Sequence, residues 1–442
     1  MKRPNLIFIM PDQFRQQCIN FMDDSDPVIT PNLDKLCGES MVLENALSNY
    51  PMCSPYRGML FTGKYPYSTG IIANCNSRRN AYGVYLKKTE RCFSDILSEN
   101  GYDLGYIGKW HLDPTDPTQE DFTEGYRDGV MWDTYTLPSR RHGFNFWYSY
   151  GACDRHLTPH YWVNNAELHE KTIINEWSVK HETNVAVRYI KNESGERDER
   201  KPFALVMAYN PPHPPYNEVP QKYKDMYEGK GNLLTRENAT NHANEHVKNY
   251  FAAVTGVDEN VGRVLSALDE QGIADDTIVV FTSDHGDMMG SHGLMGKPHW
   301  YNESFKVPFV IRYPRKIKPG KSDFILNVPD IMPSLLVMMG LGDKIPSDVE
   351  GLDKTAYFYG DAKGETTGLY MDVLANVRGL KTKRYTFVVK KNYVEDEEYI
   401  LFDDKNDPFQ LNNIAESNMD VVKGLRDDLA KYIKATKDVW DL

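Results

Sequence analysis

Short apolar runs alternate along the chain with longer segments whose apolar residues recur at helical spacing. Such runs are typical of buried strands, and amphipathic segments between them favour a parallel sheet covered by helices. The clearest predicted strands are Asn5–Met10, Leu104–Ile107, Phe203–Ala208, Thr277–Thr282 and Val307–Ile311. The clearest predicted helices are Thr30–Cys37, Phe93–Asn100, Glu176–Asn192, Asn244–Gln271 and Val328–Met339. The pattern predicts an α/β fold with a large mixed, mostly parallel sheet sandwiched by helices.

The pattern changes after about residue 345, where turn-forming residues replace the apolar runs. Proline, serine, aspartate and glycine punctuate the stretch from Pro346 to Gly360, which is typical of a linker. Beyond it, the pattern predicts short strands at Val377–Leu380, Tyr385–Lys390 and Tyr399–Phe402 and a closing helix at Met419–Ile433. The chain is therefore expected to form an α/β domain over residues 1–345 and a small α+β subdomain with an antiparallel sheet over residues 346–442.

Composition and charge narrow the class of protein. The chain has 442 residues, of which 40% are hydrophobic and 26% are charged, as in ordinary globular proteins. Its formal net charge of -12 disfavours nucleic acid and anionic membranes as partners, and no apolar run is long enough to span a bilayer. Six cysteines do not make a disulfide framework, and the apolar run Leu6–Met10 is too short for a signal-peptide core. We therefore expect a cytoplasmic protein with reduced thiols, or a periplasmic protein if a leader has been removed.

Polar side chains follow four of the predicted strands. In chain order they are Asp12 and Gln13, then Lys109 and His111, then His213, then Asp284 and His285, with Lys297 in the loop that comes next. Because ligands bind outside the carboxyl ends of strands in open α/β sheets, we expect these side chains to meet at one edge. Four prolines surround His213 within the segment Pro211–Tyr216, which restricts the conformation of its loop.

Two kinds of chemistry are represented at these strand ends. The candidate metal ligands are Asp12, Gln13, Asp284 and His285. Their oxygen-rich set suits a hard cation such as Ca²⁺ or Mg²⁺, whereas the imidazole of His285 also suits Mn²⁺ or Zn²⁺. The candidate cationic or proton-transfer groups are Lys109, His111, His213 and Lys297. Taken singly, each residue could instead be a turn residue, a helix cap or a solvated charge.

A cysteine opens a distinctive segment that runs from Cys53 to Gly63. Pro55 favours the first turn of a helix, so Cys53 is predicted to lie at a helix N-terminus, where backbone N–H groups favour an anion. Arg57 lies one turn further along the same face. A nucleophile beside an anion site suits attack on a negatively charged ester. The alternative is a buried and inert cysteine at the start of a helix.

The motif Cys53-Ser54-Pro55-Tyr56-Arg57, followed by Thr62-Gly63, resembles the signature of the type I sulfatases of the alkaline phosphatase superfamily. Tyr56 departs from that pattern, because the family more often has a small residue there. The segment Leu401–Pro408 resembles part of the small C-terminal sulfatase domain, so the resemblance covers nearly the whole chain. It implies an alkaline phosphatase-like fold and an enzyme that releases inorganic sulfate from a sulfated carbohydrate or another alkyl sulfate.

The resemblance also implies two cofactors. In the family, a maturation enzyme oxidises the cysteine that matches Cys53 to formylglycine, whose hydrated aldehyde is the nucleophile. A Ca²⁺ ion is bound by acidic and amide residues together with the formylglycine. By position, the matching residues of this chain are Asp12, Gln13, Cys53, Asp284 and His285. Two of them depart from the pattern, because many sulfatases have a second Asp where this chain has Gln13 and an Asn where it has His285.

The remaining roles also follow from the resemblance. Arg57 would orient the aldehyde, and Lys109 and Lys297 would contact the sulfate. His213 would donate a proton to the leaving oxygen. His111 would accept the proton whose loss releases sulfate from the hydrated aldehyde.

Two other functions stay open at this stage. A phosphonate or phosphate ester hydrolase of the same superfamily fits Asp284-His285, because related phosphoester enzymes use Asp-His at that place with transition metals. A catalytically silent binder of anionic glycans is the third hypothesis, although a binder would not need both a nucleophile and an acid. The loop Gly151–Trp162 is rich in polar and aromatic residues, and it either contacts a sugar or is an ordinary packed loop.

Overall fold

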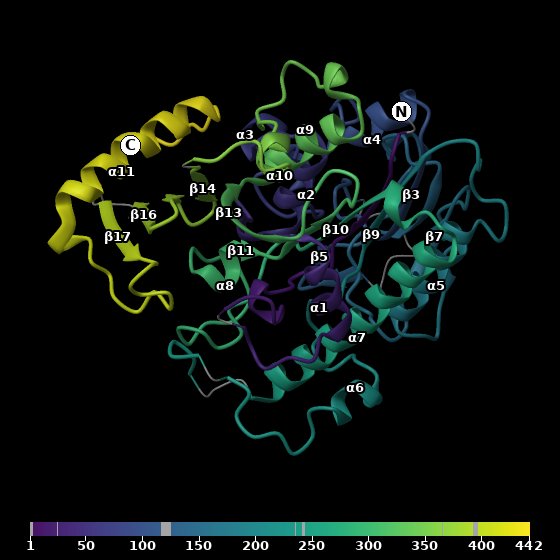
Figure 1. The fold of residues 1–442 in the computed structure, drawn as a ribbon, viewed down its shortest axis with the longest axis horizontal. Coiled ribbons are helices and arrows are strands. Elements are labelled where there is room, and N and C mark those ends of the chain that lie inside the picture. The colour runs from purple at the N-terminus through teal and green to yellow at the C-terminus, as the bar shows by residue number, and fades with distance from the viewer. Residues whose placement is uncertain are drawn as a thin grey trace.

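A large mixed sheet forms the centre of the molecule (Figure 1). The computed structural model of the chain describes residues 3–23, 25–115, 125–234, 236–240, 244–364, 366–391 and 397–442. Within these residues, eleven strands join in one sheet. Their spatial order is β11 (Lys306–Val307), β2 (Met41–Leu47), β12 (Phe309–Arg312), β10 (Thr277–Thr282), β1 (Asn5–Ile9), β9 (Phe203–Ala208), β3 (Asp103–Lys109), β6 (Phe146–Tyr150), β7 (His160–Val163) and β8 (Thr172–Ile173), with β13 (Gly320–Leu326) beside β2. The central run from β10 to β6 is parallel throughout.

Helices cover both faces of this sheet. Leu6 and Phe8 of β1 point into one hydrophobic cluster, whereas Ile7 and Ile9 point into the other, as alternation along a strand requires. The first face is covered by α2 (Cys53–Thr62), α4 (Phe93–Glu99) and α9 (Val328–Met338), and the second by α1 (Pro31–Gly38), α5 (Ser178–Lys191) and α7 (Asn244–Glu270) (Figure 1). The predicted sandwich of helices around a mixed, mostly parallel sheet is confirmed.

The main differences between the structure and the predicted elements are of three kinds. The strand expected at Val307–Ile311 is divided into β11 and β12, because Pro308 has no N–H group for the ladder. The helix expected from Glu176 begins at Ser178. Several strands were not predicted, among them β2, whose partly exposed Glu44 and Asn45 interrupt its apolar pattern.

Shorter helices lie in the connections between these elements. They are α3 (Pro66–Thr69), α6 (Gln221–Asp225), α8 (Asn302–Phe305) and α10 (Thr355–Phe358). None of the helices in the described ranges is both long enough and apolar enough to cross a membrane.

The C-terminal part carries a second, antiparallel sheet (green to yellow in Figure 1). It consists of β14 (Gly368–Asp372), β15 (Val377–Lys381), β16 (Tyr385–Lys391) and β17 (Glu397–Asp403), followed by the closing helix α11 (Met419–Ala435). The predicted antiparallel C-terminal sheet is therefore present. Leu369 and Met371 of β14 share a buried cluster with Val328 and Met332 of α9. The division into residues 1–345 and 346–442 stays a prediction.

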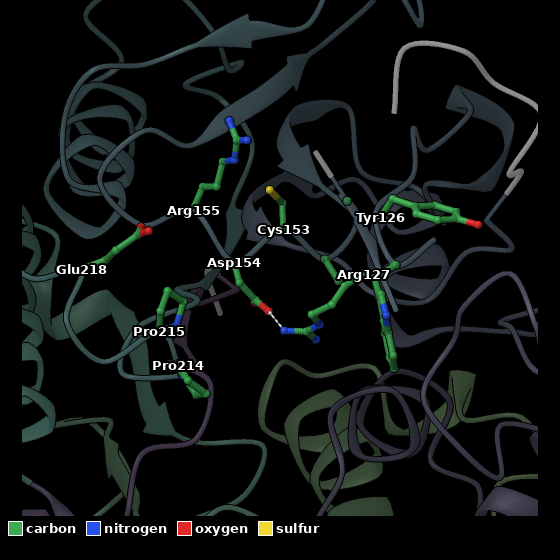
Figure 2. A pocket seen from close by; sticks show the side chains of 11 residues that line it. Tyr126, Arg127, Cys153, Asp154, Arg155, Pro214, Pro215 and Glu218 are labelled. Atoms are coloured by element: carbon green, nitrogen blue, oxygen red, sulfur yellow. Dashed lines mark hydrogen bonds and ion pairs between the residues drawn. The ribbon is translucent and has the colours of Figure 1, made fainter. Parts of the chain in front are cut away.

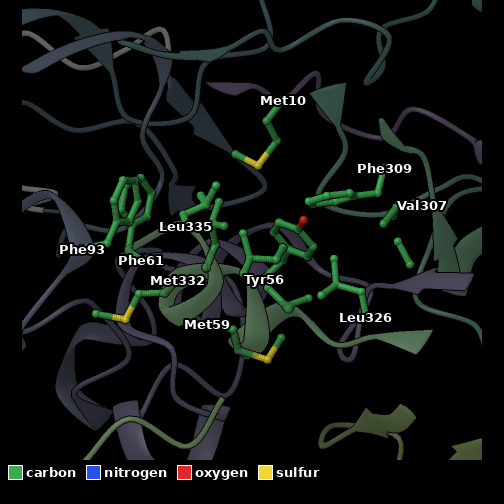
Figure 3. Close-up of a cluster of buried hydrophobic side chains, with 14 of the residues drawn as sticks. Met10, Tyr56, Met59, Phe61, Phe93, Val307, Phe309, Leu326, Met332 and Leu335 are labelled. Atoms are coloured by element: carbon green, nitrogen blue, oxygen red, sulfur yellow. The ribbon is translucent and has the colours of Figure 1, made fainter. Parts of the chain in front are cut away.

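Helix α2 is buried along its whole length. Tyr56 and Met59 lie on its core side with Met10, Phe309 and Leu326, as Figure 3 shows. The family departure at Tyr56 therefore falls in the hydrophobic core.

Gly63 ends α2 in the left-handed region, with φ of 66°, and its N–H donates to the carbonyl oxygen of Met59 at 2.8 Å. A Cβ at this position would lie 2.8 Å from the sulfur of Met332 and 2.9 Å from a methyl carbon of Val349. Both backbone conformation and packing therefore favour glycine here.

We expect Gly63→Ala to destabilise the protein more than Gly272→Ala. Gly272 has a similar φ of 63°, but a Cβ there meets nothing within 4 Å. Gly272→Ala is the control, and its free energy of unfolding should fall by about 1 kcal/mol because of the left-handed conformation alone. In Gly63→Ala, crowding should lower the free energy of unfolding by about 1–3 kcal/mol more. Denaturant midpoints of the two variants measure the difference. Equal losses would show that the contacts with Met332 and Val349 cost nothing.

Candidate active site

The carboxyl ends of four adjacent parallel strands bring the predicted residues together. Asp12 and Gln13 follow β1. Strand β10 pairs with β1 on one side, and Asp284 follows β10. On the other side, Asn210 follows β9, and Lys109 is the last residue of β3. Helix α2 then presents Cys53 to this edge from the loop that follows β2. The structure thus places side chains from widely separated segments around one point.

Cys53 is the first residue of α2, as its motif predicts, and its side chain is 1% exposed. Its sulfur lies 3.1 Å from the Lys297 ammonium, 3.5 Å from Nε2 of His285 and 3.7 Å from Asp12. Burial and the Asp12 carboxylate would raise the pKa of this thiol, but Lys297 and Lys109 together hold it well below its usual value. The thiol therefore lies in an environment that stabilises an anion.

Four residues offer ligand atoms for a cation in one small volume. One ligand atom each from Asp12, Cys53, Asp284 and His285 lies within 4.8 Å of the others. Nδ1 of His285 lies 2.9 Å from the carbonyl oxygen of Gly286, which can only accept, so Nε2 is the ring nitrogen left for a metal. Nε2 is 3.5 Å from an oxygen of Asp12 and 3.5 Å from an oxygen of Asp284. Neighbouring ligands about 2.4 Å from one cation are roughly 3.4 Å apart, so the spacing fits.

The electrostatics of the two carboxylates also fit a cation. Burial would raise the pKa of Asp12, but Lys109 and Lys297 hold it well below its usual value. Burial and the nearby Asp12 instead raise the pKa of Asp284. Two buried carboxylates side by side repel each other, and a divalent cation between them would relieve that repulsion.

Gln13 adds an amide whose orientation is fixed by its partners. Its Nε2 donates to the carboxylate of Asp287 and to the hydroxyl of Tyr216 at 3.2 Å, while its Oε1 accepts from Lys297 at 2.9 Å. A carboxylate can only accept and an ammonium can only donate, so the amide cannot be reversed without losing both contacts. The amide oxygen thus lies on the side of Lys297, which itself contacts Cys53.

Arg57 and Lys109 surround the same carboxylates. Nη2 of Arg57 lies 3.3 Å from Asp12 and 3.5 Å from Asp284, and its Nη1 donates to the backbone carbonyl of Lys109. The Lys109 ammonium is 2.8 Å from Asp12 and 3.1 Å from Oδ1 of Asn210. Burial would lower the pKa of Lys109, but Asp12 and Cys53 raise it above its usual value. Both cations therefore keep their charge.

Two histidines approach the site with different ring nitrogens available. Nε2 of His111 lies 3.1 Å from the carbonyl oxygen of Cys75 and donates to it, which leaves Nδ1 as an acceptor, and burial lowers the pKa of His111. His213 is partly exposed, and its Nδ1 faces the carbonyl oxygen of Pro214 at 2.8 Å and Asp154 at 3.3 Å. His111 therefore suits a proton acceptor, whereas Nε2 of His213 is the nitrogen left for a ligand.

Three further residues were not predicted as part of the site. Asn210 donates from Nδ2 to Asp154 at 3.2 Å, so Lys109, Asn210, Asp154 and His213 form a continuous chain of contacts. Asp154 lies in the loop Gly151–Trp162, whose polar and aromatic composition was the one available signal. Asp287 also contacts Tyr216, at 2.6 Å, and it accepts from the backbone N–H groups of Met289 and Gly296 at the start of the Lys297 loop.

Known proteins are similar to this chain in fold and in sequence. A family model described as Sulfatase matches residues 4–341, and one described as N-sulphoglucosamine sulphohydrolase, C-terminal, matches residues 290–436. The endo-4-O-sulfatase of Bacteroides thetaiotaomicron is 39% identical, covering 99% of this chain and 93% of that protein. The ulvan-active sulfatase of Formosa agariphila is 32% identical, and the match covers 93% of this chain and 77% of that protein. A solved structure described for metabolism of multiple glycosaminoglycans by Bacteroides thetaiotaomicron is 38% identical, with a TM-score of 0.93 over 99% of this chain and 98% of that chain.

Fold and site define an alkaline phosphatase-like hydrolase that acts on an anionic ester. The chain belongs to the sulfatase family, and the resemblance read from its sequence is confirmed. It is a sulfuric ester hydrolase. The roles of the individual site residues remain predictions.

In metal-free protein made without a maturation enzyme, we expect the Cys53 thiol to remain ionised at pH values where ordinary thiols are protonated. Its folded pKa is depressed, so the thiolate is lost only when the pH falls through that low value. Lys297→Met should raise this pKa, because one of the two lysines that stabilise the thiolate is removed. A pH titration followed by the ultraviolet absorbance of the thiolate, with Cys53→Ala as the blank, measures the Cys53 pKa in the unsubstituted protein and in Lys297→Met. Titration in the ordinary thiol range would contradict the expectation.

Proposed function

We propose that this sulfatase hydrolyses a sulfate ester on a sulfated carbohydrate and releases inorganic sulfate. The relatives support the substrate class, since one is named for ulvan and a similar structure is described for glycosaminoglycan metabolism. The observation that carries the proposal is the position of Cys53, 3.1 Å from Lys297 and among three potential metal ligands. A reactive atom, fixed positive charge and a cation site in one buried volume suit attack on a negatively charged ester.

The proposal assigns the nucleophile to formylglycine, made from Cys53 by a maturation enzyme. The hydrated aldehyde supplies an oxygen nucleophile in place of the thiol sulfur. Arg57 lies one helical turn along α2 and is held by Asp12 and Asp284, so its guanidinium is fixed beside residue 53. That position suits orientation of the aldehyde hydrate.

The proposal also includes a divalent cation, with Ca²⁺ first and Mg²⁺ or Mn²⁺ as alternatives. Asp12, Asp284 and His285 would hold it together with residue 53. The resemblance adds Gln13, whose Oε1 accepts from Lys297. When bound, such a cation supplies positive charge that favours an ionised hydroxyl and offsets charge on the sulfuryl oxygens.

The protein's own groups then have distinct tasks. Lys109 and Lys297 remain cationic and offset charge on the non-bridging sulfate oxygens. His213 holds its Nδ1 toward Asp154 and Pro214, so its Nε2 donates a proton to the leaving alcohol oxygen. His111 keeps Nδ1 unprotonated and accepts the proton whose loss releases sulfate. Cleaving the ester and releasing sulfate in separate steps divides the barrier.

Hydrolysis of phosphonate or phosphate esters at the same site is a second candidate activity of this sulfatase. His285 favours it, because its Nε2 faces Asp12 and Asp284 and an imidazole suits transition metals better than Ca²⁺. The third hypothesis, a silent glycan binder, is wrong, because the chain belongs to the sulfatase family.

Cys53→Ala should lose sulfate release and still bind a sulfated sugar, because the cationic groups remain. Cys37→Ala, which removes another buried thiol from α1, should keep activity. Mass spectrometry of the Cys53 peptide, from protein made with a maturation enzyme, should show the aldehyde or its hydrate. Full turnover by Cys53→Ala would exclude residue 53 as the nucleophile.

Chelation should abolish turnover and lower the melting temperature, because the Asp12–Asp284 repulsion returns. Elemental analysis of the purified enzyme identifies the metal. Sulfate and phosphate monoesters of one alcohol then separate the two candidates. Calcium with a preference for the sulfate ester supports the sulfatase proposal, whereas manganese or zinc with a preference for the phosphate ester supports the alternative.

A further inference from the structure

A pocket of about 470 Å³ opens beside the candidate active site. Its walls come from three segments, namely the hairpin with Tyr126, Arg127 and Trp132, the loop with Asp154 and Arg155, and the proline loop with Glu218. Figure 2 shows Arg127 and Asp154 reaching toward each other across the pocket, whereas the guanidinium of Arg155 points away from them. The volume lies within the range of pockets that bind small organic ligands.

Three lining residues connect this pocket to the two histidines of the site. Asp154 lies 3.3 Å from His213, and Pro214 accepts from the same ring at 2.8 Å. The Trp132 ring packs edge-on against His111, with centroids 6.2 Å apart. Because His213 is the proposed donor to the leaving oxygen, the pocket lies where the alcohol part of the substrate leaves the sulfate.

Arg127 lies on a two-stranded hairpin with a tight turn. Strand β4 (Tyr126–Arg127) pairs with β5 (Val130–Met131) through Asp128 and Gly129, which have φ of 53° and 73°. Two residues with positive φ make a type I′ turn, which suits a two-residue hairpin. Met131 exchanges hydrogen bonds with Ser77, at 3.0 Å in each direction, so the hairpin is attached to the body of the protein.

The carboxylates in the pocket are already engaged with protein groups. Asp154 accepts from Asn210 and faces His213, and its pKa lies well below its usual value because His213 and Lys109 outweigh the effect of burial. Glu218 accepts the backbone N–H groups of His156 and Leu157 at 2.6 and 3.2 Å. Both carboxylates therefore stabilise the walls of the pocket through contacts with protein groups.

Arg127 differs from these acids because most of its donors face the solvent. Its side chain is 60% exposed, and its guanidinium lies over the Trp132 ring at 5.6 Å. Among the described residues, its side chain has one hydrogen-bond partner, Asp154, at 3.2 Å from Nη1. A guanidinium has five N–H donors, so it retains donors for a planar or tetrahedral anion.

We propose that this pocket is the subsite for a sugar unit joined to the sulfated sugar, and that Arg127 pairs with an anionic substituent on that unit. The substituent is a carboxylate or a second sulfate, both of which the fork of an arginine binds in two-point geometry. The inference rests on the proposed function, because it assigns the pocket to the leaving-group side of a sulfate ester. Arg127 is then the residue that distinguishes acidic glycans from neutral ones.

Binding to the Cys53→Ala protein tests the subsite without turnover. The probes are three disaccharides with a sulfate on the same hydroxyl, whose second unit is a uronic acid, the same unit with its carboxyl reduced to an alcohol, or a neutral sugar with a second sulfate. Calorimetry should show the reduced probe binding about 10- to 100-fold more weakly than the better acidic probe. The order of the two acidic probes identifies the anion.

Adding Arg127→Gln should reduce this preference to about 2-fold or less, and Arg127→Lys should restore part of it, since lysine keeps the charge without the fork. Arg200→Gln is the matched control, because Arg200 is 89% exposed and also pairs with a single carboxylate, that of Asp198. It removes the same charge outside the pocket and should keep the preference. Equal affinity for the three probes, or an equal loss for all of them in Arg127→Gln, would overturn the inference.

Turnover separates this inference from the proposed function. In mature enzyme, Arg127→Gln should lower kcat/KM for the acidic probes about 10-fold or more and change it little for the reduced probe. A general defect at His213, through the lost Asp154 contact, would lower all three equally and would contradict a role in specificity. A mature enzyme that releases no sulfate, while Cys53→Ala keeps its Arg127-dependent preference, would overturn the proposed function and leave the subsite supported.

Discussion

The buried carboxylate of Asp12 is the constraint on which the site depends. It has no exposure to solvent, so its charge is tolerable only with cations close by. Lys109 at 2.8 Å, Arg57 at 3.3 Å and Lys297 at 3.6 Å supply them from β3, from α2 and from the loop after β10. Three distant segments must therefore converge before the charge is neutralised, and the same convergence brings Cys53 against Lys297. The contacts that neutralise the charge of Asp12 are therefore the same contacts that assemble the reaction centre.

Local sequence was sufficient to predict the framework of this arrangement. Strands β1, β9 and β10 are buried on both faces, so each appears as an uninterrupted apolar run whose last residue can be located. The polar residues after those runs meet because parallel strands end at one edge. Pro55 placed Cys53 in a first helical turn for an equally local reason.

Features that depend on distant partners were not predictable in this way. Strand β2 is stabilised by pairing with β11, β12 and β13, and its own pattern of Glu44 and Asn45 does not indicate a strand. Asp154 and Asp287 belong to the site only because the loops that carry them fold back onto His213 and Gln13. Periodicity indicates which face of an element is buried, but it does not indicate the direction in which a loop returns.

The burial of α2 has a consequence for the timing of biosynthesis. Residue 53 is 1% exposed, and every other residue of its helix is buried between the sheet and α9. An enzyme that oxidises Cys53 needs access to the surrounding backbone, which the native structure does not provide. For the maturation proposed above, oxidation has to precede the docking of this helix, so a chain that folds first is trapped as a thiol protein. The yield of active enzyme would then depend on the rate of Cys53 oxidation relative to the rate of folding during synthesis.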